Sequence, residues 1–453
     1  MTAPTLRIRA IELYERPVTQ RLPFRFGAAT VTRCPQAFVR IHADVDGHRT
    51  EGITAELMVP KWFDKSPALT HEQNFEQLRE ALRIARESYL AHTQQDSLSP
   101  WQLAQQAGEA AIAQAMSRGL PRLVAQFGTA QLDKAVADAA LHATGHSWVD
   151  GVSAGVLGDP WSPHIDLKAA SHVTLRHTVG LADILREGSS NELPQDGLPA
   201  TLEAAIRRYG LHHFKLKLSG KHEADVERLT QIAELLDEQA GDYRVTLDGN
   251  ETFTDAASLG AFWNAIVPEK SLRELLSRTL LLEQPLARSV ALRESIRSLG
   301  IRVPVILDES DDHPEAFEEG LALGYSGISS KACKGIYRSL HSAARVAKEP
   351  AKLLLSGEDL TCQAGLAVQQ DTLLASSLGV THIERNGHHY VDGFGIAPEA
   401  ESQAFARAFH GFYSQTGKPR LAVADGRLSL ASLHVPGFAS SAAPHWDSLQ
   451  PIV

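Results

Sequence analysis

The feature that most constrains this chain is a series of short apolar runs that end in charged residues. The first, His213–Leu218, alternates hydrophobic and basic side chains, and the two-residue period of a strand places Lys215 and Lys217 on one face. A solvated edge strand has the same alternation, and this hexamer alone favours that interpretation. The runs that follow favour a different one.

Three later runs end in a carboxylate and a fourth ends in a lysine. They are Val245–Asp248, Leu280–Glu283, Val305–Asp308 and Ile328–Lys331. Successive charged ends lie roughly one strand-plus-helix unit apart, about 30 residues. Charges at the carboxyl ends of successive strands are how a (β/α)8 barrel assembles an active site, so we expect all of them at one mouth.

Apolar runs and amphipathic stretches alternate through residues 165–414, which predicts an α/β protein with a (β/α)8-type barrel there. The expected strands are 173–179, 213–218, 245–248, 280–283, 305–308, 327–331, 352–356 and 381–384. The expected helices are 202–209, 223–239, 256–266, 290–299, 314–323, 336–347 and 365–377. A stretch rich in Gly and Pro, residues 155–165, marks the predicted domain boundary.

Residues 1–155 predict an α+β capping domain, completed by the tail 415–453. Ala37–Ala43 reads as a strand, and His71–Gly145 has helical periodicity with a break at Ser97–Pro100. Between the first strands, Pro23–Gly27 is expected to be a short aromatic loop. A packed turn and a mobile lid over a site explain this loop equally well.

Composition excludes several classes of function. The 453 residues carry a net charge of −10, which argues against a nucleic-acid or anionic-membrane partner. Cys34, Cys333 and Cys362 are an odd number without metal-ligand spacing, so neither a disulfide framework nor a zinc site is expected. Residues 1–9 lack a signal-peptide core and no run of 18 apolar residues occurs, so we expect a cytoplasmic protein with no membrane partner.

Three carboxylates at one mouth would repel one another and raise their pKa values unless a cation lay between Asp248, Glu283 and Asp308. Hard oxygen ligands of this kind suit Mg²⁺. Lys217 and Lys331 belong to strands four apart in a ring of eight, hence to opposite sides of the mouth. A metal flanked by lysines suits removal of a proton next to a carboxylate, with the metal stabilising the enediolate and a lysine as base.

In its motifs the sequence resembles the enolase superfamily, in particular the muconate-cycloisomerase-like branch of the mandelate racemase/muconate lactonizing enzyme family. The matching motifs are FKLKL with Lys215 and Lys217, LDGN with Asp248 and Asn250, LEQP with Glu283, LDES with Asp308, and SKACKG with Lys331. The resemblance implies three roles for these residues. Asp248, Glu283 and Asp308 would bind Mg²⁺, Lys217 and Lys331 would be the acid/base groups on opposite faces, and Lys215 would be the cationic neighbour of Lys217.

Two strand ends depart from relatives in this superfamily. Strand seven ends Ser356–Glu358 without the histidine of a His-Asp dyad, which argues against the mandelate-racemase-like branch. Strand eight reads Ile383–Asn386, where dipeptide epimerases of this branch carry two aspartates one residue apart; here only Glu384 is acidic. The residues predicted to bind substrate are Phe24, Arg25, Asn250, Glu358, Glu384, Arg385 and Asn386.

The sequence thus predicts a Mg²⁺-dependent racemase or epimerase that acts on a small carboxylic acid or amino-acid derivative, and a homo-oligomer. A dehydratase or a cycloisomerase of the same superfamily is the alternative. A Schiff-base aldolase using Lys217 or Lys331 stays open, although it needs no cage of three carboxylates. So does a non-catalytic binding protein, against which the five intact charged positions weigh.

Overall fold

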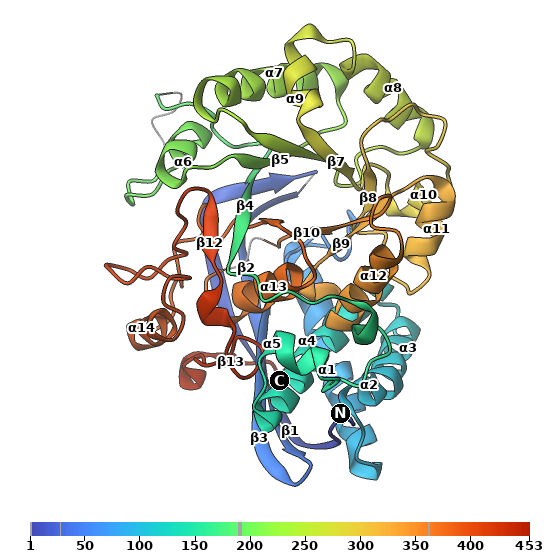
Figure 1. Ribbon diagram of the computed structural model, residues 1–453, viewed down its shortest axis with the longest axis vertical. Coiled ribbons are helices and arrows are strands. Elements are labelled where there is room, and N and C mark those ends of the chain that lie inside the picture. Colours follow the sequence, from blue (N-terminus) through green and yellow to red (C-terminus); the bar gives the residue numbers. More distant parts are fainter. Residues whose placement is uncertain (1, 28, 189–192, 361–362) are drawn as a thin grey trace.

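The computed structural model describes residues 2–27, 29–188, 193–360 and 363–453. An antiparallel sheet covered by helices packs against a closed parallel barrel (Figure 1). Cys362 lies outside the described residues, while Cys34 and Cys333 are free and buried. Within the described ranges no helix is long and apolar enough to cross a membrane.

The N-terminal sheet has the strand order β13-β1-β2-β3. Its strands are β1 (Leu6–Phe26), β2 (Ala29–Val45), β3 (His48–Leu57) and, from the tail, β13 (Gln450–Pro451). Asp46 and Gly47 both have positive φ, 47° and 86°, as a two-residue turn between antiparallel strands requires. Through β13, the C-terminal tail contributes a strand to the sheet formed by the N-terminal residues.

The predicted loop at Pro23–Gly27 is wrong, because Pro23–Phe26 are the last residues of β1. Phe24 pairs with Val31 and Arg25 with Thr30, so the segment is the end of a long hairpin. In Figure 1 this blue hairpin extends from the bottom of the view to the barrel, near β4 and β5. The hairpin thereby carries an aromatic residue of the capping sheet to the barrel mouth.

Helices cover one face of this sheet. They are α1 (His71–Gln95), α2 (Pro100–Leu103), the π-helical turn η1 (Ala104–Gly108), α3 (Glu109–Ser117), α4 (Arg122–Thr144) and α5 (Trp148–Ser153). A capping box at Thr70 starts α1, since Thr70 and Gln73 bond each other's backbone N–H. Nearly all of α4 is buried, as expected for a helix with packing partners on every side.

Eight parallel strands close into a barrel, because β11 pairs with β4, which confirms the predicted fold class. The strands are β4 (His172–Val179), β5 (His213–Lys217), β6 (Arg244–Asp248), β7 (Thr279–Glu283), β8 (Val305–Leu307), β9 (Gly327–Ser330), β10 (Leu354–Gly357) and β11 (His382–Glu384). A further strand from the tail, β12 (Arg427–Ser429), pairs antiparallel with β4.

The α-helices of the barrel region are α6 (Leu202–Tyr209), α7 (His222–Gln239), α8 (Ala256–Ile266), α9 (Arg273–Ser277), α10 (Arg288–Ala291), α11 (Ala316–Leu323), α12 (Ile336–Lys348), α13 (Leu366–Ser377) and α14 (Glu399–Ala408). Short 3₁₀ turns are η2 (Ser162–His164), η3 (Lys270–Leu272), η4 (Ala332–Lys334), η5 (Ala431–Leu433) and η6 (Trp446–Ser448). The predicted helix 290–299 is wrong beyond α10. Ser295 bonds Leu323 O and Arg297 N there, and such local side-chain bonds compete with helix.

A buried acid in the capping domain gives a test of this packing. Asp133 on α4 accepts a 2.5 Å hydrogen bond from the Tyr89 hydroxyl, and burial raises the pKa of Asp133 to about 7. Because this pKa is above that of the unfolded chain, the folded protein holds a proton that the unfolded chain releases between about pH 4 and 7. Stability should therefore fall as pH rises through that window, by on the order of a few kcal/mol.

We expect Asp133→Asn to flatten that slope, because the amide does not titrate and its oxygen can still accept the Tyr89 hydrogen bond. The free energy of unfolding, measured by urea titration at several pH values between 5 and 7.5, checks this. Glu72→Gln, at an exposed position on α1, serves as control and should keep the wild-type slope. An unchanged slope in Asp133→Asn would show that another group controls the dependence.

Candidate active site

The barrel brings the predicted charged residues to one mouth. Lys217, Asp248 and Glu283 are the last residues of β5, β6 and β7, and the register aligns Lys217 with Asp248 and Asp248 with Glu283. Asp308 directly follows β8, and Lys331 directly follows β9. All five side chains are buried. Their convergence follows from parallel strands that all end at the same rim.

The ammonium group of Lys215 lies at the centre of this cluster. Its Nζ is 2.6 Å from Glu358 Oε2, 2.7 Å from Glu283 Oε2, 2.8 Å from Glu384 Oε2 and 3.0 Å from Asp248 Oδ2. Burial disfavours the ammonium form, but the four carboxylates outweigh burial and hold the pKa of Lys215 well above its ordinary value. Lys215 is therefore a fixed positive charge.

The other two lysines flank the cluster. Lys217 Nζ lies 2.6 Å from Asp248 Oδ2, and Lys331 Nζ lies 2.6 Å from Asp308 Oδ2. Burial opposes the charge of Lys331, but Asp308 outweighs it and raises the pKa of Lys331. Since β5 and β9 are separated by three strands on either side of the ring, the two amines approach the cluster from opposite sides.

An aromatic ring covers each of these lysines. The ring centroid of Phe24 is 5.7 Å from Lys217 Nζ, and that of Trp62 is 4.3 Å from Lys331 Nζ. Both distances are within the range of a cation–π interaction. Phe24 comes from the tip of the capping hairpin and Trp62 from the segment after β3, so the capping domain supplies both rings.

Glu283 is the least satisfied carboxylate of the cluster. Neither of its oxygens accepts a hydrogen bond among the described residues; Lys215 Nζ is near Oε2 but outside hydrogen-bonding geometry. Burial and then the charges of Asp248 and Glu358 raise the pKa of Glu283 well above its ordinary value. A carboxylate in this state gains from an added cation, and its hard oxygens suit Mg²⁺.

The side chains are not arranged as a ready metal cage. Within the described residues no three His, Cys, Asp or Glu side chains are grouped to hold an ion, and the Lys215 ammonium lies between two of the predicted ligands. The donor chemistry of Asp248, Glu283 and Asp308 nonetheless fits Mg²⁺. The orphaned oxygens of Glu283 are the observation that supports this fit.

Three groups at this mouth were missed from the sequence. Glu309 is buried and accepts a 3.2 Å bond from Asn250 Nδ2; burial and then Asp308 raise the pKa of Glu309 to about 7. Lys334 Nζ donates to Asp311 Oδ2 at 2.9 Å, and Arg176 pairs with Glu358. Glu309 and Lys334 belong to the LDES and SKACKG motifs, where the second charge was a visible signal.

A small cavity of about 20 Å³, called the catalytic cavity after the role we propose for it below, lies among Lys215, Lys217 and Lys331. It is lined by Phe24, Phe26, Val59, Trp62, Lys215, Lys217, Asn250, Lys331, Asp359, Leu360 and Glu384. Phe24, Asn250 and Glu384 are thus at the cavity, as predicted for substrate contacts. The carboxylate of Glu358 lies behind Lys215, bonded to Ser356 Oγ and Arg176.

Arg385 is not brought to this cavity. Its guanidinium donates to Asp371 Oδ2 and to Thr372 Oγ1 on α13, both at 2.7 Å. Side chains of consecutive strand residues point to opposite faces, so with Glu384 inside the barrel Arg385 faces α13. Asn386 donates to Glu384 Oε1 at 2.9 Å and therefore supports that carboxylate. Arg25 is exposed and lines a neighbouring chamber.

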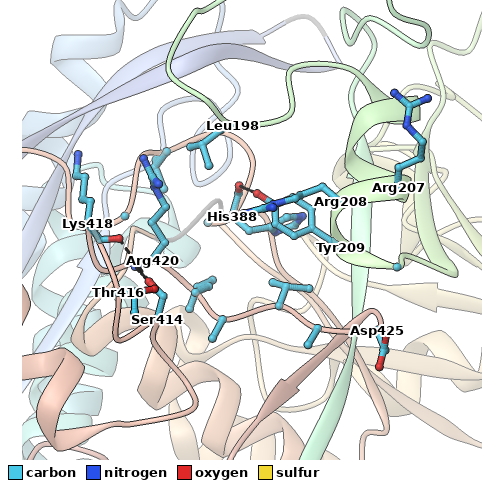
Figure 2. A pocket seen from close by; sticks show the side chains of 18 residues that line it. Leu198, Arg207, Arg208, Tyr209, His388, Ser414, Thr416, Lys418, Arg420 and Asp425 are labelled. Atoms are coloured by element: carbon cyan, nitrogen blue, oxygen red, sulfur yellow. Dashed lines mark hydrogen bonds between the residues drawn. The ribbon is translucent and has the colours of Figure 1, made fainter.

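Another cavity, of about 570 Å³, lies on the flank of the barrel. Figure 2 shows Arg208 and Tyr209 of α6 on one side of it, and Lys418 and Arg420 of the C-terminal segment on the other. Lys418 and Arg420 share Asp392 as a partner. No described residue lines both this cavity and the catalytic one, so we place no substrate contact here.

Comparison with solved structures identifies the fold. A muconate lactonizing enzyme from Mucobacterium Smegmatis, complexed with muconolactone, matches with TM-score 0.63 and 17% identity over 97% of both chains. A dipeptide epimerase from Cytophaga hutchinsonii, complexed with Mg and D-Ala-L-Val, matches with TM-score 0.63 and 14% identity over 99% of both. An enolase from Bradyrhizobium, complexed with magnesium and mandelic acid, has TM-score 0.63 and 16% identity over 98% of this chain and 97% of its own.

These matches cover whole chains, so the barrel and the capping sheet together form the fold of these enzymes. No protein-family model and no curated protein matches the sequence. The fold that the motifs predicted is confirmed. At such low identity the matches establish the architecture, and the chemistry has to be argued from the residues at the mouth.

The orphaned carboxylate makes the metal assignment testable. Glu283→Gln should weaken Mg²⁺ binding by about tenfold or more. Substituting residues that merely hydrogen-bond to metal ligands already weakens metal binding by about 10- to 100-fold. The fold should survive, because neither Glu283 oxygen is hydrogen-bonded to a described residue. Titration calorimetry measures the affinity, and circular dichroism checks the fold.

The matched control is Glu309→Gln, a buried carboxylate at the same mouth that is not a predicted ligand. It should keep most of the Mg²⁺ affinity. Equal affinity in wild type and Glu283→Gln would exclude Glu283 as a ligand.

Proposed function

We propose that the protein is a Mg²⁺-dependent enzyme that removes the proton α to the carboxylate of a small carboxylic acid or amino-acid derivative. Racemisation or epimerisation is the reaction that we favour. The observation that carries this proposal is the placement of Lys217 and Lys331 on opposite sides of one carboxylate cluster. Two amines facing each other across a planar intermediate can take a proton from one face and return one to the other.

Asp248, Glu283 and Asp308 are the residues that would hold Mg²⁺. Bound there, Mg²⁺ would supply positive charge opposite the charge that grows on the substrate carboxylate as the α-proton leaves. Lys215 adds a second, permanent positive charge at the same point, since four carboxylates hold it as an ammonium. Mg²⁺ and Lys215 together would supply the positive charge that a substrate carboxylate needs.

A lysine acts as base only in its neutral form. In the structure the ion pair with Asp308 keeps Lys331 protonated, and the net effect is a raised pKa. The nearby charge of Lys215 acts in the opposite direction and favours the neutral amine. A metal held by Asp308 would compete for this carboxylate and would weaken the attraction that keeps Lys331 protonated. Lys217 forms the equivalent ion pair on the other side, with its Nζ 2.6 Å from Asp248 Oδ2.

The rings of Phe24 and Trp62 close the small cavity over both amines, together with Phe26, Val59 and Leu360. Apolar walls exclude water from the reacting carbon and strengthen the electrostatic interactions within. This arrangement requires the substrate's α-carbon to lie between Lys217 and Lys331, because the described cavity has its charged groups there.

Dehydration and cycloisomerisation use the same site with one lysine as base and the other as a cationic stabiliser. The fold matches include a muconate lactonizing enzyme and a dipeptide epimerase, so the architecture accommodates both kinds of reaction. A Schiff-base aldolase using Lys217 or Lys331 fits less well, because that chemistry needs no cluster of carboxylates such as the one between these two lysines. Borohydride trapping with a carbonyl substrate, compared with inactivation by a chelator, separates that chemistry from ours.

The two-sided arrangement predicts the behaviour of single lysine variants. A library of carboxylic acids is first screened for α-proton exchange in D₂O with Mg²⁺ present. On an acid that exchanges, Lys331→Ala should still exchange the proton of one stereoisomer, and Lys217→Ala that of the other, each losing the opposite exchange by about 100-fold or more. Nuclear magnetic resonance of the α-proton measures both rates.

Lys418→Ala, an exposed lysine paired with Asp392 on the barrel flank, is the control and should retain both exchanges. Loss of exchange on both stereoisomers in either active-site variant would rule out the two-base reaction. A single-base elimination or cyclisation would then take its place.

A further inference from the structure

A larger chamber adjoins the catalytic cavity. It encloses about 810 Å³ and shares Phe26 and Asn250 with the catalytic cavity. Its walls come from the tip of the capping hairpin, the segment between β3 and α1, and the loops that follow β4, β5 and β6. The catalytic cavity itself, at about 20 Å³, has room for little more than one water molecule. The part of a substrate beyond its reacting carbon therefore extends into the chamber.

Basic side chains dominate the chamber wall. The basic residues are Arg25, Lys61, Lys65, Lys221 and Arg228, and the acidic residues are Asp225 and Glu251. Both acids already have partners. Asp225 accepts backbone bonds from Ser219 and Gly220, while Glu251 accepts from Arg288 and lies 2.7 Å from Lys65 Nζ. The acids thus leave most of the positive charge uncompensated.

Four of the basic groups lack a carboxylate partner within 4 Å in the described parts of the chain. They are Arg25, Lys61, Lys221 and Arg228. Lys61 Nζ instead donates to the carbonyl oxygens of Ser66, at 2.6 Å, and Leu69. Arg228 donates to the carbonyls of Gly180 and Asp183, at 2.9 and 2.7 Å. The carbonyls that hold Lys61 are neutral and leave its charge in place, whereas the charge of Arg228 also interacts with the carboxylate of Asp183, beyond ion-pair distance.

The gathering of cations here runs against the charge of the molecule as a whole, which is −10. Lys61 and Arg228 are also partly buried, so they have given up some hydration to stay at the wall. Charges of one sign in a concave site with low-dielectric walls focus their field on the space between them. Phe26 and Asn250 belong to the walls of both this space and the catalytic cavity.

We infer that this chamber binds an anionic group, a carboxylate or a phosphate, at the end of the substrate remote from the reacting carbon. The inference rests on the proposed function and narrows it to acids with two negative groups. One would face Lys215 at the barrel mouth, and the other would face Arg25, Lys61, Lys221 and Arg228 in the chamber. Arg25 then acts on the substrate through its charge at the hairpin tip.

The field of the chamber is measured first, without any substrate. Ala224→Cys places a thiol on the exposed chamber wall, and mass spectrometry follows its labelling by a negatively and a positively charged methanethiosulfonate of similar size. Relative to their rates with a free thiol, the negative reagent should react about tenfold faster or more, the lower end of electrostatic focusing. Adding Arg25→Gln and Lys221→Gln should reduce this preference several-fold.

The matched control adds Arg208→Gln and Lys418→Gln instead, which remove the same charge from the flank of the barrel. This control should keep the preference of the Ala224→Cys protein. Equal reactivity of the two reagents, or faster reaction of the positive one, would overturn the inference whatever the catalytic results.

The second measurement uses α-proton exchange with Mg²⁺ on acids of matched size. One series pairs a distal carboxylate with its carboxamide, the other a distal phosphate with its hydroxyl, and the series with the larger difference identifies the anion. Within that series the charged member should have a KM about tenfold lower, the lower end of electrostatic focusing. Arg25→Gln with Lys221→Gln should raise the KM of the charged member several-fold more than that of the neutral member, so that the difference between them largely disappears.

The outcomes separate the two proposals. Exchange that is equally efficient with charged and neutral members overturns the anionic chamber and leaves the proposed function intact. A strong labelling preference together with no exchange from any acid overturns the proposed function and leaves the anionic chamber standing.

Discussion

The buried ion cluster around Lys215 is the interaction on which the barrel mouth depends. Five carboxylates, Asp248, Glu283, Asp308, Glu358 and Glu384, face four cations, Lys215, Lys217, Lys331 and Arg176. Removing charges from water costs several kcal/mol each, and only close pairing repays that cost. Glu283 is the carboxylate that this pairing satisfies least, because neither of its oxygens accepts a hydrogen bond from a described residue, and burial with the neighbouring carboxylates raises its pKa. The ion pairs stabilise the mouth, and the carboxylate of Glu283 would still gain from one more cation.

The capping domain is fixed to the barrel by buried polar contacts, and this determines where its aromatic residues lie. Lys134 of α4, fully buried, bonds Ala55 O at 3.0 Å and lies 3.3 Å from Glu56 Oε2. Gln370 of α13 bonds both Thr54 Oγ1 and Ile53 O. These contacts tie β3 to α4 and to the barrel. β3 pairs with β2, and β2 forms the long hairpin with β1. Because this sheet is rigid, the hairpin holds Phe24 at the mouth with little freedom.

The sequence was sufficient for the barrel and its charged rim, because both follow local rules. A strand that ends in Asp or Lys can be recognised from about five consecutive residues. In a closed barrel of parallel strands, all of these ends lie at the same face. Strand pairing was harder to predict, even where it is local. Phe24–Phe26 form a strand because they pair with Ala29–Val31, and nothing in the sequence PFRF specifies that partner. The position of Arg385 could have been predicted from the sequence. Side chains alternate along a strand, so Arg385 and its neighbour Glu384 have to point to opposite faces. The ring of Glu358 and Glu384 around Lys215 combines strands two, seven and eight, a juxtaposition that spacing alone does not reveal.

Reaction and recognition are assigned to different parts of the chain. The groups that would act on the reacting carbon stand on strand ends, where the closed ring of eight hydrogen-bonded strands fixes their positions. The groups that would select the substrate stand on the hairpin tip and on loops, at Arg25, Lys61 and Lys221, where a substitution leaves the barrel unchanged. This division explains how the chain keeps one architecture with enzymes of 14–17% identity that were solved with muconolactone, a dipeptide and mandelic acid. Under the proposed function, a few positions at the rim would define the chemistry, and the charge of the chamber wall would define the acid that the site accepts.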